Sequence, residues 1–594
     1  MYYIIICSKY KIWFIMKYSE LVEIYERLEQ TPAKLKKVEI IAELLKKASK
    51  DDLYKIVLLL QGKVFPAFDE REIGLATQSM EKIVAQATGF SVKEVGQLFR
   101  KLGDFGLIAE KLIGKKKQQT LMERPLTLEK VFENLQKLAD VGGKGSQERK
   151  FRLVSELVSS AKPKEAKYLV RTSIGDLRIG VAEGIMRDAI ARAFLDTETM
   201  EKKKLSQSAV EWAWFLNSDY GKIAQIAKDS GVKGLRGVRV EPGTPYHVLL
   251  AEKSPGLKEA LEAFEHPALE FKYDGARIII HKKGERLWFF TRRLENVTRQ
   301  FPELQGFVKR AVRSRDCIIE GEMLGFDKKT GKPMPFQFLS QRIKRKYDIE
   351  KMVTEIPIQV NVFEITYLDG KEFFERPLRE RWGMLKKIIK PIKGKFQLAE
   401  HIETKDIRTA QAFYKKSLNA SQEGLIIKNL DARYHPGRRV AGGWLKVKPV
   451  MESLDLAIIG ATWGTGKRAG FLGSYILGCR DGDKFKNCGM LGSGFKEKTE
   501  AEGGSAGVTF KELTRLVRPG ITGSKGNEVA IRPSIVVEVA YEEIQRSPNY
   551  ESGYALRFPR VIRIRTDKKA RDADTRERIE RLYRQQKGKL HSNG

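Results

Sequence analysis

The sequence contains very little cysteine. Its 594 residues include only four cysteines, Cys7, Cys317, Cys479 and Cys488, which lie far apart and show no CxxC spacing. Such a pattern supports neither a disulfide framework nor a zinc site. We therefore expect the protein to work in a reducing compartment, the cytoplasm.

Long hydrophobic runs are also missing, apart from an apolar segment at the start. Residues 1–15 (MYYIIICSKYKIWFI) are too few to span a bilayer, and they include Lys9 and Lys11. A signal peptide would carry its positive charge before the apolar run and end at a small-residue cleavage site, and this segment has neither feature. We interpret residues 1–15 as an apolar extension that is not native, with Met16 as the natural start. From there KYSELVEIYERLEQ predicts an amphipathic helix capped by Ser19.

Acidic side chains are outnumbered by basic ones. The sequence has 110 Lys and Arg against 76 Asp and Glu, a formal net charge of +34. On a folded enzyme such an excess usually indicates a polyanionic partner. A solubilising surface rich in Lys and Glu, as in many heat-stable proteins, is the alternative, and composition alone leaves both open. The length allows two to four domains, and 42% of the residues are hydrophobic and can fill their cores.

The apolar spacing changes along the chain, so we expect a multidomain protein. Residues 16–235 have helical periodicity almost throughout, which predicts an all-α domain. The polar stretch 239–247, with its Pro and Gly residues, indicates a linker. In residues 236–449, β-branched and aromatic runs such as ARIIIH and GLIIK alternate with helices, which predicts an α+β domain. In residues 450–594, short strands and Gly-rich turns predict a β-barrel of OB type, followed by a charged helix near residues 573–586.

Two Gly-rich basic segments are candidates for phosphate contacts. In GGKGSQERK, Gly142, Gly143 and Gly145 lead into a helix whose free backbone N–H groups could bind a phosphate; a plain loop between helices is the alternative. WGTGKRAG fails as a nucleotide-binding P-loop, because Lys467 is followed by Arg468 where Ser or Thr is required. We expect Lys467 and Arg468 to contact DNA phosphates, with an exposed hairpin as the alternative.

The residues that carry chemistry begin at EFKYDGARIII. Here Lys272 stands just before a strand, followed by Asp274, Gly275 and Arg277. A lone KxDG occurs by chance, but further charged motifs follow it in order. They are TRRLEN with Arg292 and Glu295, EGE with Glu320 and Glu322, FEITYLDG with Phe363 and Glu364, EGLIIK with Glu423 and Lys428, WLKVK with Lys446 and Lys448, and RTDK with Arg565, Asp567 and Lys568. A set of ordered motifs carries far more weight than one.

Each motif supplies a group that a nucleotide-transfer site needs. A lysine attacks only as the neutral amine, and from an ordinary pKa of about 10.4 this costs roughly 4–5 kcal/mol at about pH 7. Neighbouring cations and desolvation must therefore lower the pKa of Lys272. The expected sources of that positive field are a bound Mg²⁺ and three later lysines, Lys428, Lys446 and Lys448. Glu322 and Glu423 offer the hard oxygens that Mg²⁺ prefers, although either alone would be an ordinary surface carboxylate.

In order and rough spacing, these segments resemble the motif set of the covalent nucleotidyltransferases, namely DNA ligases, RNA ligases and mRNA capping enzymes. From Met16 onward the chain resembles the archaeal and eukaryotic ATP-dependent DNA ligases, most closely in KYLVRTSIGDLRIGVAEG and SPNYESGYALRFPRVIRIRTDK. The resemblance implies that Lys272 takes AMP from ATP with Mg²⁺, that the AMP passes to the 5′-phosphate of a nick in double-stranded DNA, and that the 3′-hydroxyl expels it. It also implies a role in replication, repair and recombination.

The resemblance further implies what each motif residue binds. The expected contacts are Glu270 to the adenine amine, Phe363 to the base, Arg277 to the ribose or phosphate, Glu322 to the ribose or metal, and Arg292 and Arg439 to phosphates. Arg565 and Lys568 match the group that reaches the β- and γ-phosphates when the C-terminal domain folds over the nucleotide. Between YHPG and WLK the sequence RRVAGG is one residue longer than the family pattern, so Arg438 is the alternative to Arg439.

Partners and competing functions complete the expectations. KKKQQTLMERPLTL occupies the place of a sliding-clamp-binding segment, with Gln118 or Gln119 in the glutamine role, but Leu121 and Met122 stand where aromatics are expected. An exposed basic loop without a partner is the alternative. We expect a monomer that associates with the nucleoid and with no membrane. Competing functions are an RNA ligase or capping enzyme, which the long basic helical domain argues against, and a catalytically inactive DNA clamp, which the complete motifs argue against.

Overall fold

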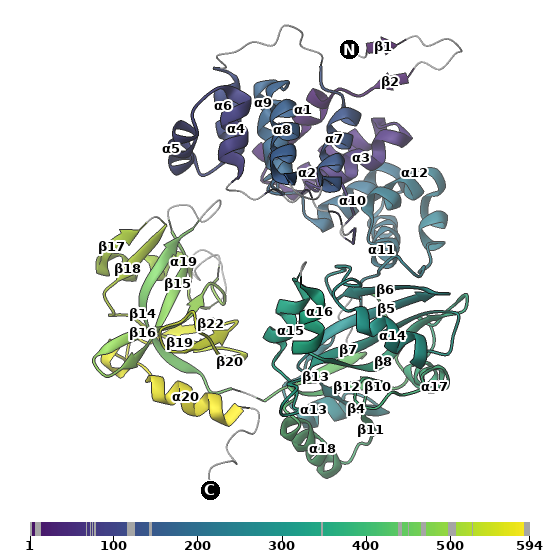
Figure 1. Cartoon of the computed structure of the whole chain (residues 1–594), viewed down its shortest axis with the longest axis vertical. Helices are drawn as coiled ribbons and strands as arrows, with labels where there is room; N and C mark the ends of the chain where they lie inside the picture. Colours follow the sequence, from purple (N-terminus) through teal and green to yellow (C-terminus); the bar gives the residue numbers. More distant parts are fainter. Residues whose placement is uncertain are drawn as a thin grey trace. The chain divides into compact units, whose positions relative to one another are not determined.

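The chain divides into two compact units in the computed structural model (Figure 1). The first comprises Met1–Glu252, Gly275–Glu400 and Asn429–Trp444, and the second Lys253–Asp274, His401–Lys428 and Leu445–Gly594. The residues that the structure describes are 3–5, 13–66, 68, 69, 71, 73, 75, 79–115, 125–141, 145–345, 348–437, 442–449, 451–464, 471–496, 506–525 and 527–586.

Helices make up the N-terminal part of the first unit. After a short antiparallel pair, β1 (Tyr3–Ile5) and β2 (Trp13–Ile15), they are α1 (Tyr18–Gln30), α2 (Lys34–Lys47), α3 (Lys50–Leu60), α4 (Met80–Thr88), α5 (Val92–Leu102), α6 (Phe105–Ile113), α7 (Leu128–Asp140), α8 (Ser146–Ser159), α9 (Pro163–Ser173), α10 (Glu183–Phe194), α11 (Met200–Asn217) and α12 (Tyr220–Arg236). They enclose one continuous hydrophobic core. The helical region that the spacing predicts is therefore present.

The first helix starts differently from the prediction. It begins at Tyr18 with Lys17 as its N-cap, so the prediction that Ser19 caps it is wrong. The reason is that Glu20 reaches back to accept a hydrogen bond from the Lys17 backbone N–H at 3.2 Å, which satisfies the helix start without a serine. The apolar face is buried as the pattern predicts; Leu21, for example, is fully buried.

One family-like segment of the helical region has a structural role. Arg171 of α9 lies buried and donates to Asp104 at 2.7 Å and to Glu29 at 2.9 Å. Asp104 also caps α6 through the N–H of Gly106 at 2.7 Å. This charged network ties α1, α6 and α9 together, because a buried guanidinium without its carboxylates would be strongly destabilising.

A mixed sheet forms the remainder of the first unit. Its strand order is β10-β8-β7-β5-β6, with β9 paired to β8. The strands are β5 (Ala276–Lys283), β6 (Arg286–Thr291), β7 (Asp316–Gly325), β8 (Ile358–Leu368), β9 (Lys371–Glu372) and β10 (Phe396–Leu398), and the helices are α14 (Pro302–Ala311), α15 (Phe336–Ile343), α16 (Ile349–Glu355) and α17 (Leu378–Ile388). All described pairs are antiparallel except β8 with β10.

The second unit contains another sheet with the order β11-β4-β12-β13-β3. Its elements are β3 (Glu252–Lys253), α13 (Leu257–Glu262), β4 (Pro267–Lys272), β11 (His401–Glu403), α18 (Ile407–Asn419), β12 (Gly424–Asn429) and β13 (Trp444–Val447). The buried face of β4 packs with α13 and α18 in a local core. This sheet brings β4 beside β12, although the two strands are far apart in sequence.

The C-terminal region of the second unit is rich in strands. They are β14 (Leu454–Trp463), β15 (Leu472–Asp481), β16 (Lys484–Leu491), β17 (Ile521–Lys525), β18 (Glu528–Ile531), β19 (Val536–Ala540), β20 (Glu543–Arg546), β21 (Tyr554–Arg557) and β22 (Arg560–Ile564), with helices α19 (Phe510–Val517) and α20 (Arg576–Gln585) and 3₁₀ turns η4 (Arg518–Gly520) and η5 (Ala570–Asp572). The main sheet runs β16-β15-β14-β18-β17, and β19 joins β14 to β22. The described strands form no closed barrel, and no described helix is long and apolar enough to cross a membrane.

Candidate active site

The strand β4 ends at Lys272, and backbone contacts fix the turn that follows. The Asp274 N–H donates to the Gln422 side-chain oxygen at 3.1 Å, and the Glu423 N–H donates to the Lys272 carbonyl at 2.9 Å. The two motifs KYDG and EGLIIK are therefore joined where β4 lies beside β12. This pairing brings the side chains of Lys272 and Glu423 to the same point.

Both motif glycines stand where a side chain would not fit. A Cβ on Gly275 would lie 2.4 Å from the Met323 carbonyl oxygen, and one on Gly424 would lie 2.2 Å from that of Val447. Gly424 also has a φ of +137°, which L-residues rarely adopt. The glycines are thus explained by close backbone approach.

Glu423 lies between two lysines of the predicted site. Its Oε2 is 2.6 Å from the Lys272 Nζ and 2.6 Å from the Lys448 Nζ. Burial alone would raise the pKa of Glu423, but these two ammonium groups lower it to about 2. The carboxylate is therefore ionised at neutral pH.

A second ion pair lies deeper in the same sheet. The Lys428 Nζ donates to the Glu270 Oε2 at 2.8 Å, and both side chains are almost completely buried. The sequence predicts Lys428 as part of the positive field around Lys272 and Glu270 as the base contact. The structure instead pairs the two with each other, so Lys428 keeps the charge of Glu270 compensated in the protein interior.

Arg277, in the first unit, belongs to a buried hydrogen-bonded network. Its Nε donates to the Glu320 Oε2 at 2.9 Å and its Nη1 to the Leu249 carbonyl at 2.6 Å. The guanidinium carbon lies 5.4 Å from the Phe363 ring centre and 5.2 Å from that of Trp444. Burial alone would lower the pKa of Arg277, but the Glu320 carboxylate holds it above its ordinary value.

Glu322 shares the sheet face of Arg277. The two residues are direct cross-strand partners on β7 and β5, so their side chains project from the same side. Phe363 lies on the neighbouring strand β8, where its carbonyl accepts a hydrogen bond from the Trp382 indole at 2.8 Å. The structure therefore groups Arg277, Glu322 and Phe363 as the motif order predicts.

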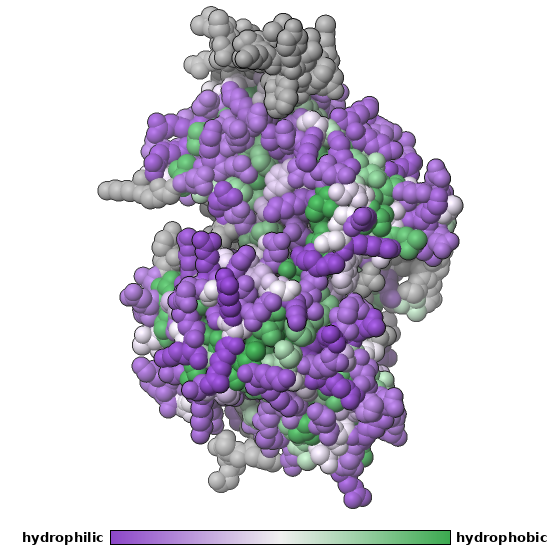
Figure 2. All heavy atoms as spheres, turned by 90° about the vertical axis from the view of Figure 1, so that its right-hand side faces the viewer, coloured by the Kyte–Doolittle hydropathy of each residue, from purple (hydrophilic) through white to green (hydrophobic). Residues whose placement is uncertain are grey.

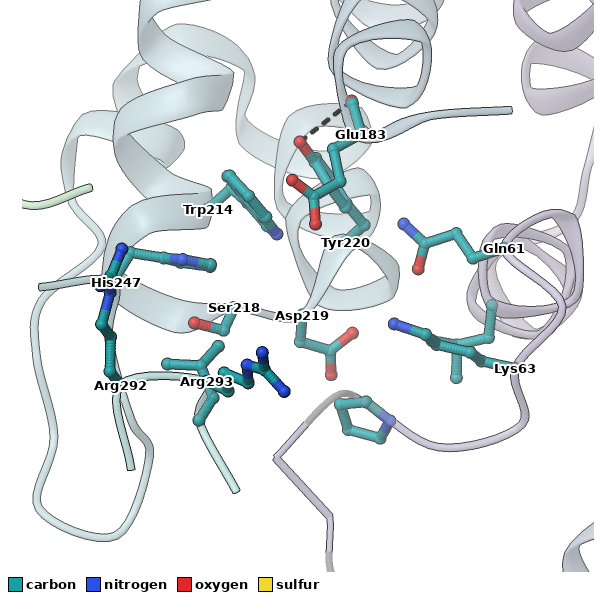
Figure 3. A pocket seen from close by; sticks show the side chains of 13 residues that line it. Gln61, Lys63, Glu183, Trp214, Ser218, Asp219, Tyr220, His247, Arg292 and Arg293 are labelled. Carbon is teal, nitrogen blue, oxygen red and sulfur yellow. Dashed lines mark hydrogen bonds between the residues drawn. The ribbon is translucent and has the colours of Figure 1, made fainter. Parts of the chain in front are cut away.

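Arg292 lines a cavity of about 150 Å³ together with Arg293 (Figure 3). The opposite walls come from the helical region and include Trp214 and Asp219. In Figure 3, Lys63 and Arg293 extend toward Asp219. Arg292 is exposed at this cavity, and its contact with nucleotide phosphates stays a prediction.

The RTDK residues are held on the C-terminal strands by carboxylates. Arg565 donates to Asp455 at 2.7 Å and to Asp567 at 2.6 Å, and Lys568 donates to Asp455 at 2.5 Å. The pKa of Asp567 lies below its ordinary value because of this arginine. Asp455 stands near the start of β14 and was not marked by any sequence motif.

The remaining predicted residues divide into described and undescribed ones. Lys446 lies on β13, where its carbonyl accepts the Ser254 N–H at 3.1 Å. The phosphate candidates Arg438 and Arg439, the basic pair Lys467 and Arg468, and the clamp segment 118–122 lie outside the described residues. Gly142 and Gly143 also lie outside them, whereas Gly145 is the N-cap of α8.

The carboxylates of the site fit a magnesium ion. The described residues contain no group of three or more His, Cys, Asp or Glu side chains that could hold a metal. Magnesium at a nucleotide needs only one or two protein carboxylates, because phosphates and water supply the other ligands. Glu423, in the second unit, suits this role because it is half-buried and ionised. Glu322, in the first unit, is also a half-buried carboxylate.

Comparison with known proteins gives a consistent result along the chain. Residues 17–191 match the family described as DNA ligase N terminus, residues 248–448 match ATP dependent DNA ligase domain, and residues 468–568 match ATP dependent DNA ligase C terminal region. The chain is 44% identical to a DNA ligase of Nanoarchaeum equitans, over 97% of this chain and 100% of that protein. It is 42% identical to a DNA ligase of Thermococcus onnurineus, over 96% and 98%. The chain belongs to the ATP-dependent DNA ligase family.

This ligase seals single-strand nicks in duplex DNA, and ATP and a divalent metal ion are its cofactors. The family result argues against the competing interpretations as an RNA ligase or a capping enzyme. The solved structure named "Pmar-Lig_PreS3" matches the fold of the ligase with a TM-score of 0.53, over 92% of this chain and 99% of that one. Its sequence identity of 17% means that this likeness shows the fold alone.

Several residues of the ligase's site escaped the motif search. Tyr246 and Tyr434 both donate to Glu320, the latter at 2.5 Å. Glu320 itself belongs to the EGE motif, but its role as the acceptor of these hydrogen bonds was not predicted, although on a strand it shares the face of Glu322 two residues later. Tyr434 is the first residue of the YHPG segment, whereas Tyr246 lies in the predicted linker and nothing local marks it.

Proposed function

We propose that Lys272 is the nucleophile of the ligase and carries AMP as a lysyl-adenylate. The observation that carries this proposal is its position at the end of β4, with its ammonium group 2.6 Å from the half-buried, ionised Glu423. In the resting protein the ion pair with Glu423 holds the Lys272 side chain in place. The amine attacks once it has lost its proton, so the Lys272–Glu423 pair must loosen when the nucleotide arrives.

The contacts of the other residues support distinct roles around the nucleotide. Glu270 accepts a hydrogen bond from the adenine amine, and Phe363 stacks on the base. Arg277 binds the ribose or a phosphate, and Arg292 and Arg439 bind phosphates. Lys446 and Lys448 neutralise the α-phosphate during attack.

Glu322 and Glu423 would hold the divalent metal, for which we propose Mg²⁺. An ion held there would supply the positive charge that neutralises the phosphates of the nucleotide. Lys448 forms an ion pair with Glu423, and Lys428 forms one with Glu270.

We propose three domains, with boundaries near residues 235 and 449, and an OB-type barrel in the last. The helical domain supplies most of the sequence-independent phosphate contacts with DNA, in keeping with the net charge of +34. Phe558 is a candidate base contact of the C-terminal domain. Its ring is 61% exposed and its φ is +50°, a strained combination that functional sites often retain.

The remaining proposals concern partners and place of action. The ligase works as a monomer in the cytoplasm, associated with nucleoid DNA, in replication, repair and recombination. Segment 118–122 binds a sliding clamp weakly. This proposal is supported by the position of the segment in the chain. If a Leu121→Ala/Met122→Ala variant binds the clamp with unchanged affinity, that part of the proposal is wrong.

The nick-sealing assignment is tested by comparing substrates. Purified protein should seal nicked duplex DNA with ATP and leave single-stranded RNA ends unjoined. The same assay with ADP, GTP and NAD establishes which nucleotides Lys272 accepts. Joining of RNA ends at a rate equal to that of nicked DNA would contradict the proposed substrate.

A further inference from the structure

Two buried tyrosines converge on a single carboxylate in the first unit. The Tyr246 and Tyr434 hydroxyl groups both donate to the Glu320 Oε1. Glu320 uses its other oxygen, Oε2, to accept from the Arg277 Nε at 2.9 Å. Tyr246, Tyr434 and Glu320 are all at most 1% exposed. Both carboxylate oxygens therefore accept hydrogen bonds, Oε1 from the two phenols and Oε2 from the guanidinium.

The same network fixes the opposite side of the guanidinium. The Tyr434 hydroxyl accepts the Leu249 N–H at 2.8 Å, and the Leu249 carbonyl accepts the Arg277 Nη1 at 2.6 Å. This closes a ring of contacts from Tyr434 through Leu249 to Arg277 and back through Glu320. Burial and the Glu320 charge hold the pKa of both tyrosines well above the ordinary value, so they stay protonated donors.

Tyr246 also connects this ring to the helical region. The next residue, His247, donates its backbone N–H to the Phe215 carbonyl of α11 at 2.8 Å. Its ring lies 4.2 Å, centre to centre, from that of Trp214, also in α11. The predicted linker is thus packed against α11, and the position of Tyr246 depends on that packing.

We infer that Tyr246 and Tyr434 are positioning residues for adenylation, which hold Arg277 through Glu320 in the orientation that binds ATP. This rests on the proposed function, because Arg277 is assigned there to the nucleotide. A guanidinium flanked by two rings can rotate about its stem unless its hydrogen bonds are fixed. The phenols fix them, because a carboxylate that loses a buried donor turns toward another partner.

The test is a double-mutant cycle on self-adenylation. Tyr434→Phe keeps the ring and removes one hydroxyl. It should raise KM for ATP about tenfold and change kcat less than about twofold. This is the pattern expected when an enzyme loses an interaction that it makes equally with the bound substrate and with the transition state. In an Arg277→Lys background, the same change should raise KM less than about twofold, because the group it positions is gone. Tyr246→Phe should behave like Tyr434→Phe, and it supplies the test if Tyr434→Phe lowers the melting temperature.

Tyr25→Phe is the matched control, since Tyr25 is fully buried and its hydroxyl has no hydrogen-bond partner among the described residues. It should leave KM unchanged. A tenfold rise from Tyr434→Phe in both backgrounds, or no rise in either with normal stability, would overturn the inference. An Arg277→Lys variant with normal KM would instead remove the proposed role of Arg277, and the two failures are therefore distinguishable.

Discussion

Glu423 is the residue on which the charges of the second unit converge. Its Oε2 forms ion pairs with the ammonium groups of Lys272 and Lys448, each at 2.6 Å. A carboxylate with this burial would ordinarily resist ionisation, and the two cations reverse that tendency. The arrangement stabilises the resting fold. In the proposed mechanism the Lys272–Glu423 ion pair must break before Lys272 can attack.

This pairing predicts a pH dependence of stability. The folded-state pKa of Glu423, about 2, lies below its unfolded value, so its contribution is present above about pH 4.3 and is lost as the pH falls toward 2. Glu423→Gln should therefore lower the free energy of unfolding by about 3 kcal/mol at about pH 7, and by progressively less below about pH 4. Urea unfolding at a series of pH values measures this. The control is Glu133→Gln, which changes an exposed ion pair with Lys137 and should have little effect on stability. If Glu423→Gln lowers the free energy of unfolding by the same amount down to about pH 2, the low pKa assigned to Glu423 is contradicted.

Arg565 and Lys568 should act on one chemical step only. Pyrophosphate leaves during self-adenylation, so groups that bind the β- and γ-phosphates can help only there. Replacing either with Ala should slow self-adenylation by about 10²-fold, and sealing of a nick that already carries 5′-AMP should change much less. Lys569→Ala, at the exposed neighbour, is the control. Equal slowing of both steps would make the RTDK group structural, as its ion pairs with Asp455 and Asp567 also allow.

At the scale of elements, the boundary between β2 and α1 marks where the helical region begins. The Tyr18 N–H donates to the Leu126 carbonyl and the Leu128 N–H to that of Met16, each at 2.9 Å. Tyr18 itself is fully buried. The body of the region is therefore anchored from Met16 onward, where the helical pattern of the sequence also starts.

Truncations on either side of this boundary should differ. Deleting residues 1–15 should leave ligation and the melting temperature unchanged, because the pairs at Met16 and Tyr18 survive. Deleting residues 1–18 removes both pairs and the buried Tyr18 ring, and it should lower the melting temperature by about 4 °C or more. Calorimetry measures the melting temperature of both truncated proteins. If the shorter deletion lowers it by several degrees, residues 1–15 pack on the helical region.

Elements and motifs differ in how far the sequence predicts them. Strands β5, β7, β8 and β12 follow from β-branched runs, since local pattern alone specifies them. The ordered motifs and the resemblance assign Lys272 and Glu423 to one site, but they do not predict that the two side chains form an ion pair. Tyr246 could not be found in this way, because it stands in a polar stretch while its partner Glu320 lies 74 positions further along. The Ser19 cap was wrong because the helix begins earlier, at Tyr18, where Glu20 accepts a hydrogen bond from the backbone N–H of the N-cap residue Lys17.

At the scale of the whole molecule, charge is the dominant feature. Hydrophilic side chains predominate on the face drawn in Figure 2, with apolar ones scattered among them. The net charge of +34 is far more than folding requires. A ligase must hold DNA of any sequence, and phosphate contacts are the sequence-independent means to do so.

Binding to nicked DNA should therefore weaken steeply with salt. Counterion release predicts a fall in affinity of about 10³-fold between about 50 and 200 mM salt, as for proteins that contact six or more phosphates. Titration of labelled nicked duplex at several salt concentrations measures the slope. A flat response would mean that the positive surface serves solubility and not DNA binding.

The most direct test of the whole account is where AMP becomes attached. Wild-type protein incubated with α-labelled ATP and Mg²⁺ should acquire label on Lys272, identified in the digested peptide that contains EFKYDGAR. Lys272→Ala should acquire none and still bind nicked DNA, whereas Lys258→Ala, an exposed lysine of the same unit, should label normally. Label that persists in Lys272→Ala, or that maps to another residue of the wild-type chain, would contradict the assignment of Lys272 as the nucleophile.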